Sequence, residues 1–348
     1  MTNTPRRPQL RIAINSRCGR ACFYCRPSGE GLATGPGLEI DPSDLAFFTT
    51  VAAALGLRDV KITGGDPALH TRLVPAIRMV RTEADVRSIE VISRHPLIAA
   101  SAHELADAGV DLFNMSIDTI DPLVHQRITG VDDLAQVLHA LDTLIGTGVP
   151  VKVNTVVMDG VNTAEVSRLI TFCENSGVAS LKLLDVIDDL DAGREFNRVR
   201  LRKQGNVMNL HDLYTPLQAI ANELASIAVE VTTLQQGGLG HPMTVFTLAS
   251  GLQVIVKDST AGSWCGPMCA TCSHYPCHDA LMALRLTADL RLQFCLLRED
   301  VTIDVAEIIR ARDEVALTGA LSTTLTEYEL AEFHPAAASS VAIRGGGS

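Results

Sequence analysis

Short runs of strand-forming residues alternate with longer amphipathic stretches through the first half of the chain. Six such runs come before residue 190, and they span residues 10–15, 60–63, 88–93, 112–117, 151–157 and 180–187. The stretches between them have aspartate or serine near their starts and glycine at their ends, as capped helices do. Strands that alternate with helices are typical of a parallel sheet with crossover helices. The pattern therefore predicts an α/β fold, a full or partial (β/α) barrel.

The pattern changes after residue 190. Residues 191–206 are rich in charge and predict a connecting loop, and residues 210–228 predict a helix. Residues 243–260 predict a hairpin that turns at Ser250-Gly251. A cysteine-rich stretch follows, and then a last pair of strands around residues 284–297. These elements predict a small α+β unit behind a partial barrel of six β/α units.

Length, charge and composition narrow the class of protein. A chain of 348 residues can form one large domain and a smaller one, which we place at residues 1–220 and 221–335, before a glycine-rich tail at 336–348. A formal charge of −11 without a basic block argues against general binding of nucleic acid or of membrane surfaces. No secretory signal is evident, nor any run of about 20 apolar residues. We therefore expect a cytoplasmic enzyme with no nucleic-acid or membrane partner.

The nine cysteines need an explanation in such a protein. Cys173 lies alone on an apolar helical pattern and predicts a small buried side chain. The other eight fall into two clusters, within residues 18–25 and 265–295. Cytosolic thiols stay reduced, and a secreted disulfide scaffold does not fit this length. Clustered cysteines in a reducing compartment indicate metal ligands first.

Cys18, Cys22 and Cys25 follow the first predicted strand with the spacing C-x3-C-x2-C. A structural zinc site usually needs four ligands, and no fourth cysteine or histidine follows nearby. Three thiolates on one loop suit a [4Fe-4S] cluster that keeps one iron open. A zinc site or chance spacing is the alternative interpretation. Catalytic groups of a barrel also gather at the carboxyl ends of its strands, where this loop lies.

This spacing, with the aromatic Tyr24 before the last cysteine, resembles the signature of the radical S-adenosylmethionine enzymes. The resemblance implies that S-adenosylmethionine chelates the open iron through its amino and carboxylate groups. An electron from the cluster then cleaves it to methionine and a 5'-deoxyadenosyl radical, which abstracts a hydrogen from the substrate. A reducing partner such as a flavodoxin or ferredoxin is implied as well.

Further sequence elements resemble this family in the same order. Gly64, Gly65 and Asp66 end the second predicted strand in a GGDP sequence that resembles the GGEP motif, which binds the methionine amino group. Paired glycines allow the backbone to approach a ligand closely. Aspartate keeps the acceptor of the glutamate but shortens its reach. Ser116 resembles a polar contact to the cofactor from the fourth strand, with a satisfied strand serine as the alternative.

The second cysteine cluster is similar to that of one subgroup, the GTP 3',8-cyclases of molybdenum-cofactor synthesis. In that subgroup a CxxC pair and a later cysteine hold a second [4Fe-4S] cluster in a small twitch or SPASM-like domain. The ligands that the resemblance implies are Cys269, Cys272 and Cys295. The chain departs from the subgroup by about nine inserted residues after the CxxC pair and by two extra cysteines. Either Cys265 or Cys277 could supply a fourth ligand and close the cluster to substrate; a zinc knuckle is the alternative.

The resemblance to the cyclases runs over nearly the whole chain and includes positions that bind triphosphate. Four basic residues occupy such positions, and they are Arg11, Lys61, Lys152 and Arg285. Lys61 stands where the cyclases have an arginine, which keeps the charge but loses the planar fork. Ser93 stands roughly where they have a threonine, and Ala283 replaces the first of two arginines. Four cations directed into one cavity favour an anionic, phosphorylated substrate; pairing with acidic residues is the alternative.

These observations support one leading hypothesis and three alternatives. The leading hypothesis is a radical enzyme with two [4Fe-4S] clusters that abstracts hydrogen from a nucleotide or a related phosphorylated small molecule, followed by cyclisation or rearrangement. The departures lie at substrate-facing positions, so we expect a diverged relative of the cyclases. The alternatives are the GTP 3',8-cyclase itself, a peptide-modifying radical enzyme, and a non-catalytic iron–sulfur or zinc protein that senses redox state.

Overall fold

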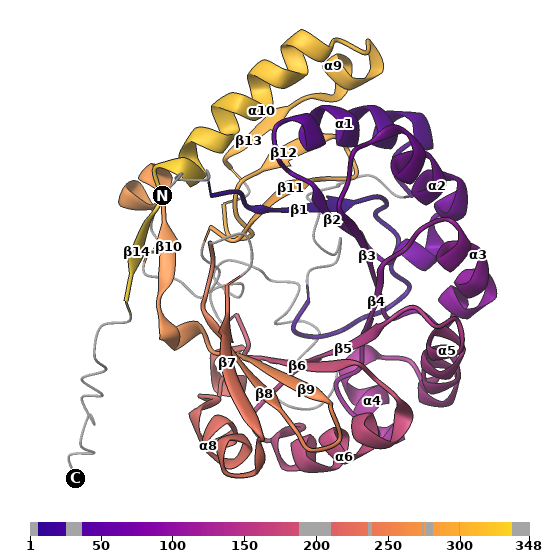
Figure 1. Cartoon of the computed structure of the whole chain (residues 1–348), viewed down its shortest axis with the longest axis vertical. Coiled ribbons are helices and arrows are strands. Elements are labelled where there is room, and N and C mark those ends of the chain that lie inside the picture. The colour runs from indigo at the N-terminus through magenta and orange to yellow at the C-terminus, as the bar shows by residue number, and fades with distance from the viewer. Residues whose placement is uncertain are drawn as a thin grey trace.

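A computed structural model describes residues 6–25, 37–187, 210–235, 239–272, 275, 281–298 and 300–335. Within these residues, a sheet of 12 strands curves strongly around an open interior and carries helices on its outer side (Figure 1). The predicted loop at residues 191–206, the glycine-rich tail and Cys277 lie outside the described residues.

The six strands predicted in the first half of the chain are all present. They are β1 (Gln9–Ala13), β2 (Asp59–Thr63), β3 (Ser88–Ser93), β4 (Leu112–Ser116), β5 (Val151–Val156) and β6 (Ser180–Leu184). From β1 to β6, each strand pairs in parallel with the one before it in this series. The expected α/β fold with a partial, open barrel is therefore confirmed.

Helices connect these strands across the outer face of the sheet. They are α1 (Pro42–Ala54), α2 (Leu73–Glu83), α3 (Ala102–Asp107), α4 (Pro122–Thr129), α5 (Leu134–Gly146) and α6 (Val166–Ser176). Asp41 caps α1 by accepting a hydrogen bond from the Ser43 amide at 2.9 Å. Gly130 ends α4 with a left-handed φ of 78°, which glycine adopts without strain. No helix in the described ranges has both the length and the apolar surface needed to span a lipid bilayer.

Strands from the last third of the chain extend both edges of this sheet. They are β7 (Glu230–Leu234), β8 (Met243–Thr247), β9 (Gln253–Lys257), β11 (Ala283–Leu286), β12 (Arg291–Gln293) and β13 (Thr302–Asp304). β9 lies parallel to β6 and β11 lies parallel to β1, so two more parallel strands join the six predicted ones. The predicted hairpin is confirmed as β8 and β9, and the predicted last strand pair as β11 and β12.

The C-terminal segment folds back onto the first half of the chain. A two-stranded sheet pairs β10 (Ser263–Cys265) with β14 (Glu332–His334). The helices of this half are α8 (Gln218–Ile227), α9 (Ala306–Arg310) and α10 (Glu314–Glu329). Arg312, between α9 and α10, forms an ion pair of 2.6 Å with Asp44 of α1. The boundary that we place between residues 220 and 221 thus separates strands of one continuous sheet.

Alternation along the strands decides which side chains reach the interior of the barrel. Leu10 and Ile12 of β1 are fully buried in the core beneath the helices, while Arg11 between them lines the interior. Val151 and Val153 of β5 show the same arrangement. Because successive side chains of a strand point to opposite faces, one face builds the core and the other carries polar groups inward.

Candidate active site

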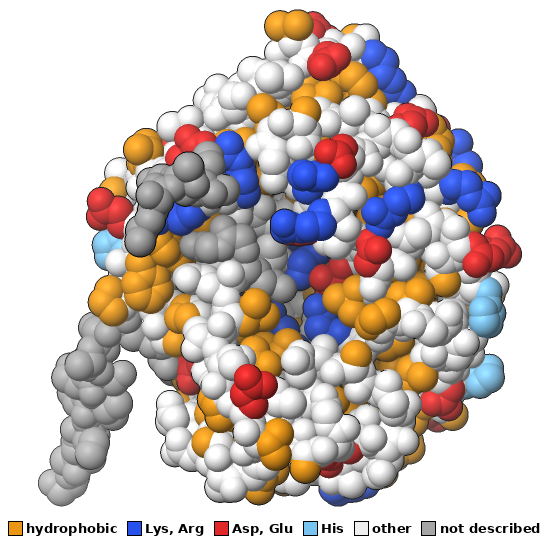
Figure 2. Space-filling model, viewed as in Figure 1, with side chains coloured by type: hydrophobic (Ala, Val, Ile, Leu, Met, Phe, Trp, Pro, Cys, Tyr) orange, Lys and Arg blue, Asp and Glu red, His pale blue; other side chains and the backbone are white. Residues whose placement is uncertain are grey.

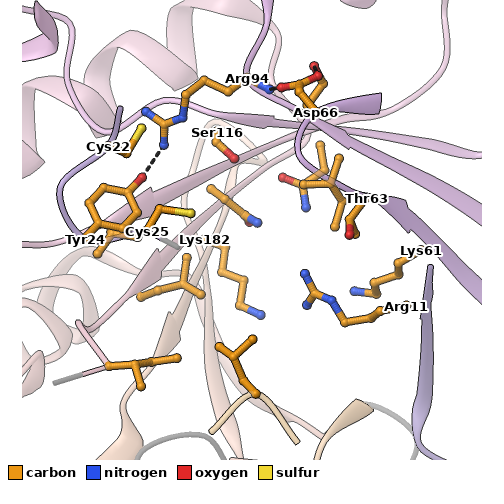
Figure 3. A pocket seen from close by; sticks show the side chains of 18 of the residues that line it. Arg11, Cys22, Tyr24, Cys25, Lys61, Thr63, Asp66, Arg94, Ser116 and Lys182 are labelled. Atoms are coloured by element: carbon orange, nitrogen blue, oxygen red, sulfur yellow. Dashed lines mark hydrogen bonds between the residues drawn. The ribbon is translucent and has the colours of Figure 1, made fainter. Parts of the chain in front are cut away.

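The inward-facing side chains surround one cavity of about 320 Å³ inside the curved sheet. The strands contribute these charged or amide side chains to its wall: Gln9, Arg11, Lys61, Asn114, Lys152, Asn154, Lys182, Lys257 and Arg285. The structure thus brings together all four basic residues that the sequence singled out. The loops after β1, β2 and β3 line the same cavity, so it lies at the carboxyl ends of the parallel strands (Figure 3).

One buried carboxylate joins two of the predicted lysines. Glu90 of β3 lies 2.9 Å from the Nζ of Lys61 and 2.5 Å from the Nζ of Lys152. Burial raises the pKa of Glu90, but the two ammonium groups outweigh it and hold the pKa well below its usual range. Burial, opposed by Glu90, lowers the pKa of Lys61 to about 8. One carboxylate cannot neutralise two ammonium groups, so this part of the wall keeps positive charge.

Two further lysines, which were not predicted from the sequence, belong to the wall. Lys182 of β6 and Lys257 of β9 both line the cavity. Within the described part of the chain, neither ammonium group has an ion-pair partner. Burial first, and then the neighbouring lysines, lower the pKa of Lys182 well below its usual value. A single lysine between aliphatic residues of a predicted strand, as in VKI, VKV and LKL, is the signal that would have found Lys182.

Positive charge outweighs negative charge around the cavity. Seven of its described lining residues are lysine or arginine and three are aspartate. Figure 2 shows lysine and arginine side chains in and above the central hollow of the molecule, although the chain as a whole carries a net charge of −11. Such a local concentration of cations in an acidic protein favours an anionic ligand.

Three cysteines enter the same cavity from the loop after β1. Cys18, Cys22 and Cys25 all line it, as the sequence predicted. Burial raises the pKa of the Cys18 thiol to about 11, and the neighbouring Asp66 and Cys22 add to the rise. A metal binds cysteine in its thiolate form. The positive charge of a metal centre would offset the free-energy cost of ionising this buried thiol. Among the described residues, no three histidine, cysteine, aspartate or glutamate side chains are gathered closely enough to hold one metal ion.

The GGDP turn is joined to the backbone of this cysteine loop. The Gly65 amide donates to the Asn15 carbonyl at 2.8 Å, and the Asp66 amide donates to the Arg17 carbonyl at 2.6 Å. A Cβ atom on Gly65 would lie 2.2 Å from the Arg17 carbonyl oxygen. We expected the paired glycines to admit a ligand, and they do line the cavity. Their close approach, however, is to the chain just before Cys18, which explains why glycine is required.

Asp66 uses its carboxylate within the protein. Its two oxygens accept hydrogen bonds from the Ala68, Arg94 and His95 amides and from the Ser93 hydroxyl, at 2.6 to 3.0 Å. Asp66 and Ser93 are both buried and line the cavity, and the carboxylate ties the end of β2 to the end of β3. Ser116, at the end of β4, lines the cavity as well.

A buried network that the sequence did not reveal holds Tyr24. Its hydroxyl donates to Asp118 Oδ2 at 2.7 Å and accepts a hydrogen bond from the Arg94 guanidinium (Figure 3). Arg94 also forms an ion pair of 2.8 Å with Asp118, and its Nη1 has no partner among the described residues. Burial lowers the pKa of Arg94, but Asp118 and Tyr24 outweigh it and raise the pKa above its usual value. A fixed cation therefore lies beside the cysteine loop.

Acceptor groups complete the cavity. Asn154 Oδ1 and Asp185 Oδ1 are buried and find no hydrogen-bond partner among the described residues. Both residues line the cavity, and the other oxygen of Asp185 accepts hydrogen bonds from Ser259. A buried acceptor without a partner is costly. These oxygens therefore suit a ligand that brings hydroxyl or amine donors as well as negative charge.

The second cysteine cluster lines a separate, smaller cavity. Four cysteines line it, and they are Cys265, Cys269, Cys272 and Cys295; as at the first site, no three of their thiols are close enough to share a single metal ion, so only a larger group such as a cluster could bridge them. The three cysteines implied as ligands are thus brought together with one of the two extra ones. The other, Cys277, lies outside the described residues.

Comparisons with known proteins agree with this arrangement. Residues 12–173 match the family model of the Radical SAM superfamily, where SAM is S-adenosylmethionine. Over 303 residues the chain is 30% identical to a protein from Pyrococcus abyssi named "Probable GTP 3',8-cyclase", with 86% of this chain and 88% of that protein covered. A protein of the same name from Metallosphaera sedula is 30% identical over 307 residues, with 87% and 85% covered.

Among solved structures, SuiB of Streptococcus suis bound to S-adenosylmethionine has a similar fold. The TM-score is 0.57 at 12% sequence identity, and the match covers 90% of this chain and 67% of that one. At this identity the likeness concerns the fold alone. The family match, the extended similarity to the cyclases and the cysteine loop at the cavity lead to one assignment. The chain belongs to the radical SAM superfamily and is a relative of the GTP 3',8-cyclases.

Proposed function

We propose that this enzyme abstracts a hydrogen atom from an anionic, phosphorylated small molecule, of the nucleotide class, held in the cation-lined cavity. Cys18, Cys22 and Cys25 would hold a [4Fe-4S] cluster. When bound, this cluster supplies the electron that breaks a carbon–sulfur bond of S-adenosylmethionine and so yields methionine and the 5'-deoxyadenosyl radical. The residues of the cavity would hold the substrate so that one of its C–H hydrogen atoms passes to that radical, which would give 5'-deoxyadenosine and leave the substrate to cyclise or rearrange.

The residues around the cysteine loop would orient the cofactors. Gly64 and Gly65 bring the end of β2 against the loop, and their position beside the cavity suits contact with the methionine end of S-adenosylmethionine. Asp66 and Ser93 act in this proposal chiefly by holding that turn in place, because their mutual hydrogen bond and the backbone donors occupy the carboxylate. Ser116 would contribute a hydroxyl from the end of β4.

Tyr24 is locked by its hydrogen bond to Asp118, which fixes the aromatic ring beside the last cysteine of the loop. This ring would shield the cluster from water. The predicted reductant, a flavodoxin or ferredoxin, and the predicted cytoplasmic location belong to the same proposal.

The distribution of charge in the cavity carries the proposal for the substrate. Lys61 and Lys152 share one carboxylate, and Lys182 and Lys257 lie beside them without an acidic partner in the described residues. A ligand with several negative charges offsets this repulsion, and phosphate oxygens accept hydrogen bonds from ammonium groups. Its hydroxyl or amine groups would donate to Asn154 and Asp185. The cavity volume of about 320 Å³ lies in the range of small-molecule sites.

The similarity to the cyclases makes GTP the first substrate to test. The test uses anaerobically reconstituted protein with dithionite and S-adenosylmethionine, and it measures 5'-deoxyadenosine with GTP, with guanosine and with no addition. We expect GTP or another nucleoside triphosphate to stimulate release, and guanosine to fail because it lacks the charge. A cyclised GTP product would make the enzyme a GTP 3',8-cyclase. Equal release with and without every phosphorylated compound would contradict the proposed substrate class.

A charge variant tests the binding mode directly. Lys182→Gln removes one cavity cation at similar length, and we expect the dissociation constant of the stimulating nucleotide to rise about tenfold or more. Arg78→Gln, on the exposed face of α2, is the matched control and leaves affinity unchanged. Equal nucleotide affinities for the wild type and Lys182→Gln would remove Lys182 from the binding site.

A further inference from the structure

Four cysteines from three segments of the chain line the second cavity. Cys265 ends β10, and Cys295 follows β12. The 3-10 turn at Pro267–Thr271 contains Cys269 and is followed by Cys272. All four side chains line one cavity, whose other described walls include Met268, Leu281 and Leu297. Thiols enclosed by apolar side chains are the usual surroundings of an iron–sulfur cluster rather than of a hydrated ion.

Backbone contacts hold this cysteine segment in place. The Cys269 amide donates to the Gly266 carbonyl at 2.9 Å, and the Cys272 amide donates to the Cys269 carbonyl at 3.1 Å. A Cβ atom on Gly266 would lie 2.6 Å from the carbonyl oxygen of Glu327 in α10, so glycine is required beside Cys265. The Met268 amide donates to the Glu327 carboxylate at 3.0 Å. The position of Cys265 is thus set by its packing against α10.

Cys265 is also the most deeply placed of the four thiols. It is buried, at 7% exposure, whereas the other three cysteines are only partly buried. The segment around Cys265 is fixed by its packing against α10, and the thiol is shielded from solvent. Both features suit a permanent ligand of a cluster. The Arg298 guanidinium, which pairs with Asp300 at 2.8 Å, lines the same cavity as Cys272. Charge near the ligand sulfurs is among the features that set cluster potentials.

We infer that Cys265 is the fourth ligand of a second [4Fe-4S] cluster, so that every iron of this cluster has a cysteine ligand. The complete set would be Cys265, Cys269, Cys272 and Cys295. Such a cluster has no open iron to which a substrate could bind. The inference rests on membership of the family and not on the substrate proposed above.

The relation between the two cavities agrees with this assignment. They share no described lining residue, but residues adjacent in the chain line both cavities. Met282 and Leu296 line the first cavity, and their neighbours Leu281 and Leu297 line the second. The second site therefore lies next to the substrate cavity with the chain between them. Substrate binding is left to the cations of the first cavity.

The experiment isolates the second site by replacing Cys18, Cys22 and Cys25 with alanine. This triple variant, reconstituted anaerobically with iron and sulfide, should hold about four irons per chain. Three variants are then made in it: Cys265→Ser, Cys277→Ser and, as a matched control at a buried lone cysteine, Cys173→Ser. Each is oxidised mildly and examined by electron paramagnetic resonance and Mössbauer spectroscopy, without S-adenosylmethionine or substrate. Thermal unfolding confirms that each variant remains folded.

A cluster with one weakly held iron loses it on oxidation and becomes a [3Fe-4S] cluster, which has a distinct resonance signal. We expect that signal, or loss of iron, from Cys265→Ser, and an intact four-iron cluster from the parent, Cys277→Ser and Cys173→Ser. The signal in Cys277→Ser but not in Cys265→Ser would assign the fourth ligand to Cys277 and overturn the inference. A [3Fe-4S] signal already in the parent would mean that three cysteines bind. Zinc in place of iron would refute the cluster itself.

Discussion

Glu90 and the lysines beside it illustrate how single residues set the properties of the cavity. Burial lowers the pKa of Lys61 to about 8. Its side chain is therefore charged below that pH and loses its charge above it. We therefore expect the affinity for inorganic triphosphate or GTP, measured calorimetrically, to be highest below about pH 8 and to fall as the pH rises through that value. Lys61→Arg stays charged at every pH tested and should reduce this decline, while the part that comes from Lys182, whose pKa burial also lowers, remains.

Glu90 itself should matter to stability more than to chemistry. Glu90→Gln keeps the shape but leaves two ammonium groups buried without a carboxylate, and we expect the free energy of unfolding to fall by about 3 kcal/mol. Because the pKa of Glu90 is held below its usual range, its contribution is present at neutral pH and is lost as the pH falls. Urea denaturation measures the loss. Glu104→Gln, exposed on α3, is the control and should change little.

At the scale of elements, the contact between the GGDP turn and the cysteine loop leaves the least room for a larger side chain. Gly65→Ala places a Cβ atom 2.2 Å from the Arg17 carbonyl, and neither backbone has room to move without breaking the hydrogen bonds between them. We expect this variant to lose most of the iron bound by the first site. Iron analysis of protein that lacks the second site, through Cys269→Ala and Cys272→Ala, measures the loss.

The matched control is Gly146→Ala at the end of α5, where a Cβ atom meets nothing within 4 Å. This variant should keep its iron and be as stable as the wild type, or slightly more so, because alanine favours helix. Full iron content in Gly65→Ala would show that the turn and the loop separate freely, against the packing described above.

The alternation within strands explains what could be predicted at this scale. The strand runs and GGDP were recognisable because apolar periodicity and paired glycines are local signals. Lys182 and Arg94 were missed because their role depends on which strands become neighbours. Lys182 reaches the cavity through the curvature of the sheet, and Arg94 meets Asp118 across the ends of β3 and β4.

The whole molecule depends on the C-terminal third to complete the sheet. β11 pairs with β1 and β9 pairs with β6, so a fragment of residues 1–220 exposes both edges of the parallel sheet. Unpaired edges favour association between chains. We expect the fragment to aggregate or remain largely unfolded, as measured by circular dichroism and light scattering against the full chain. A monomeric, cooperatively unfolding fragment would instead support two independent domains with the boundary at residue 220.

Local pattern in the sequence was sufficient to determine the α/β class, the six strands of the barrel and the cysteine motif that marks the family. These properties depend on neighbours within a few residues, through periodicity, capping and ligand spacing. Only the tertiary structure decided that eight parallel strands surround the cavity, that Lys182 and Lys257 join its charge, and that Cys265 lies with Cys269, Cys272 and Cys295. Those features join segments far apart in the chain, and their meeting is set by sheet curvature and packing.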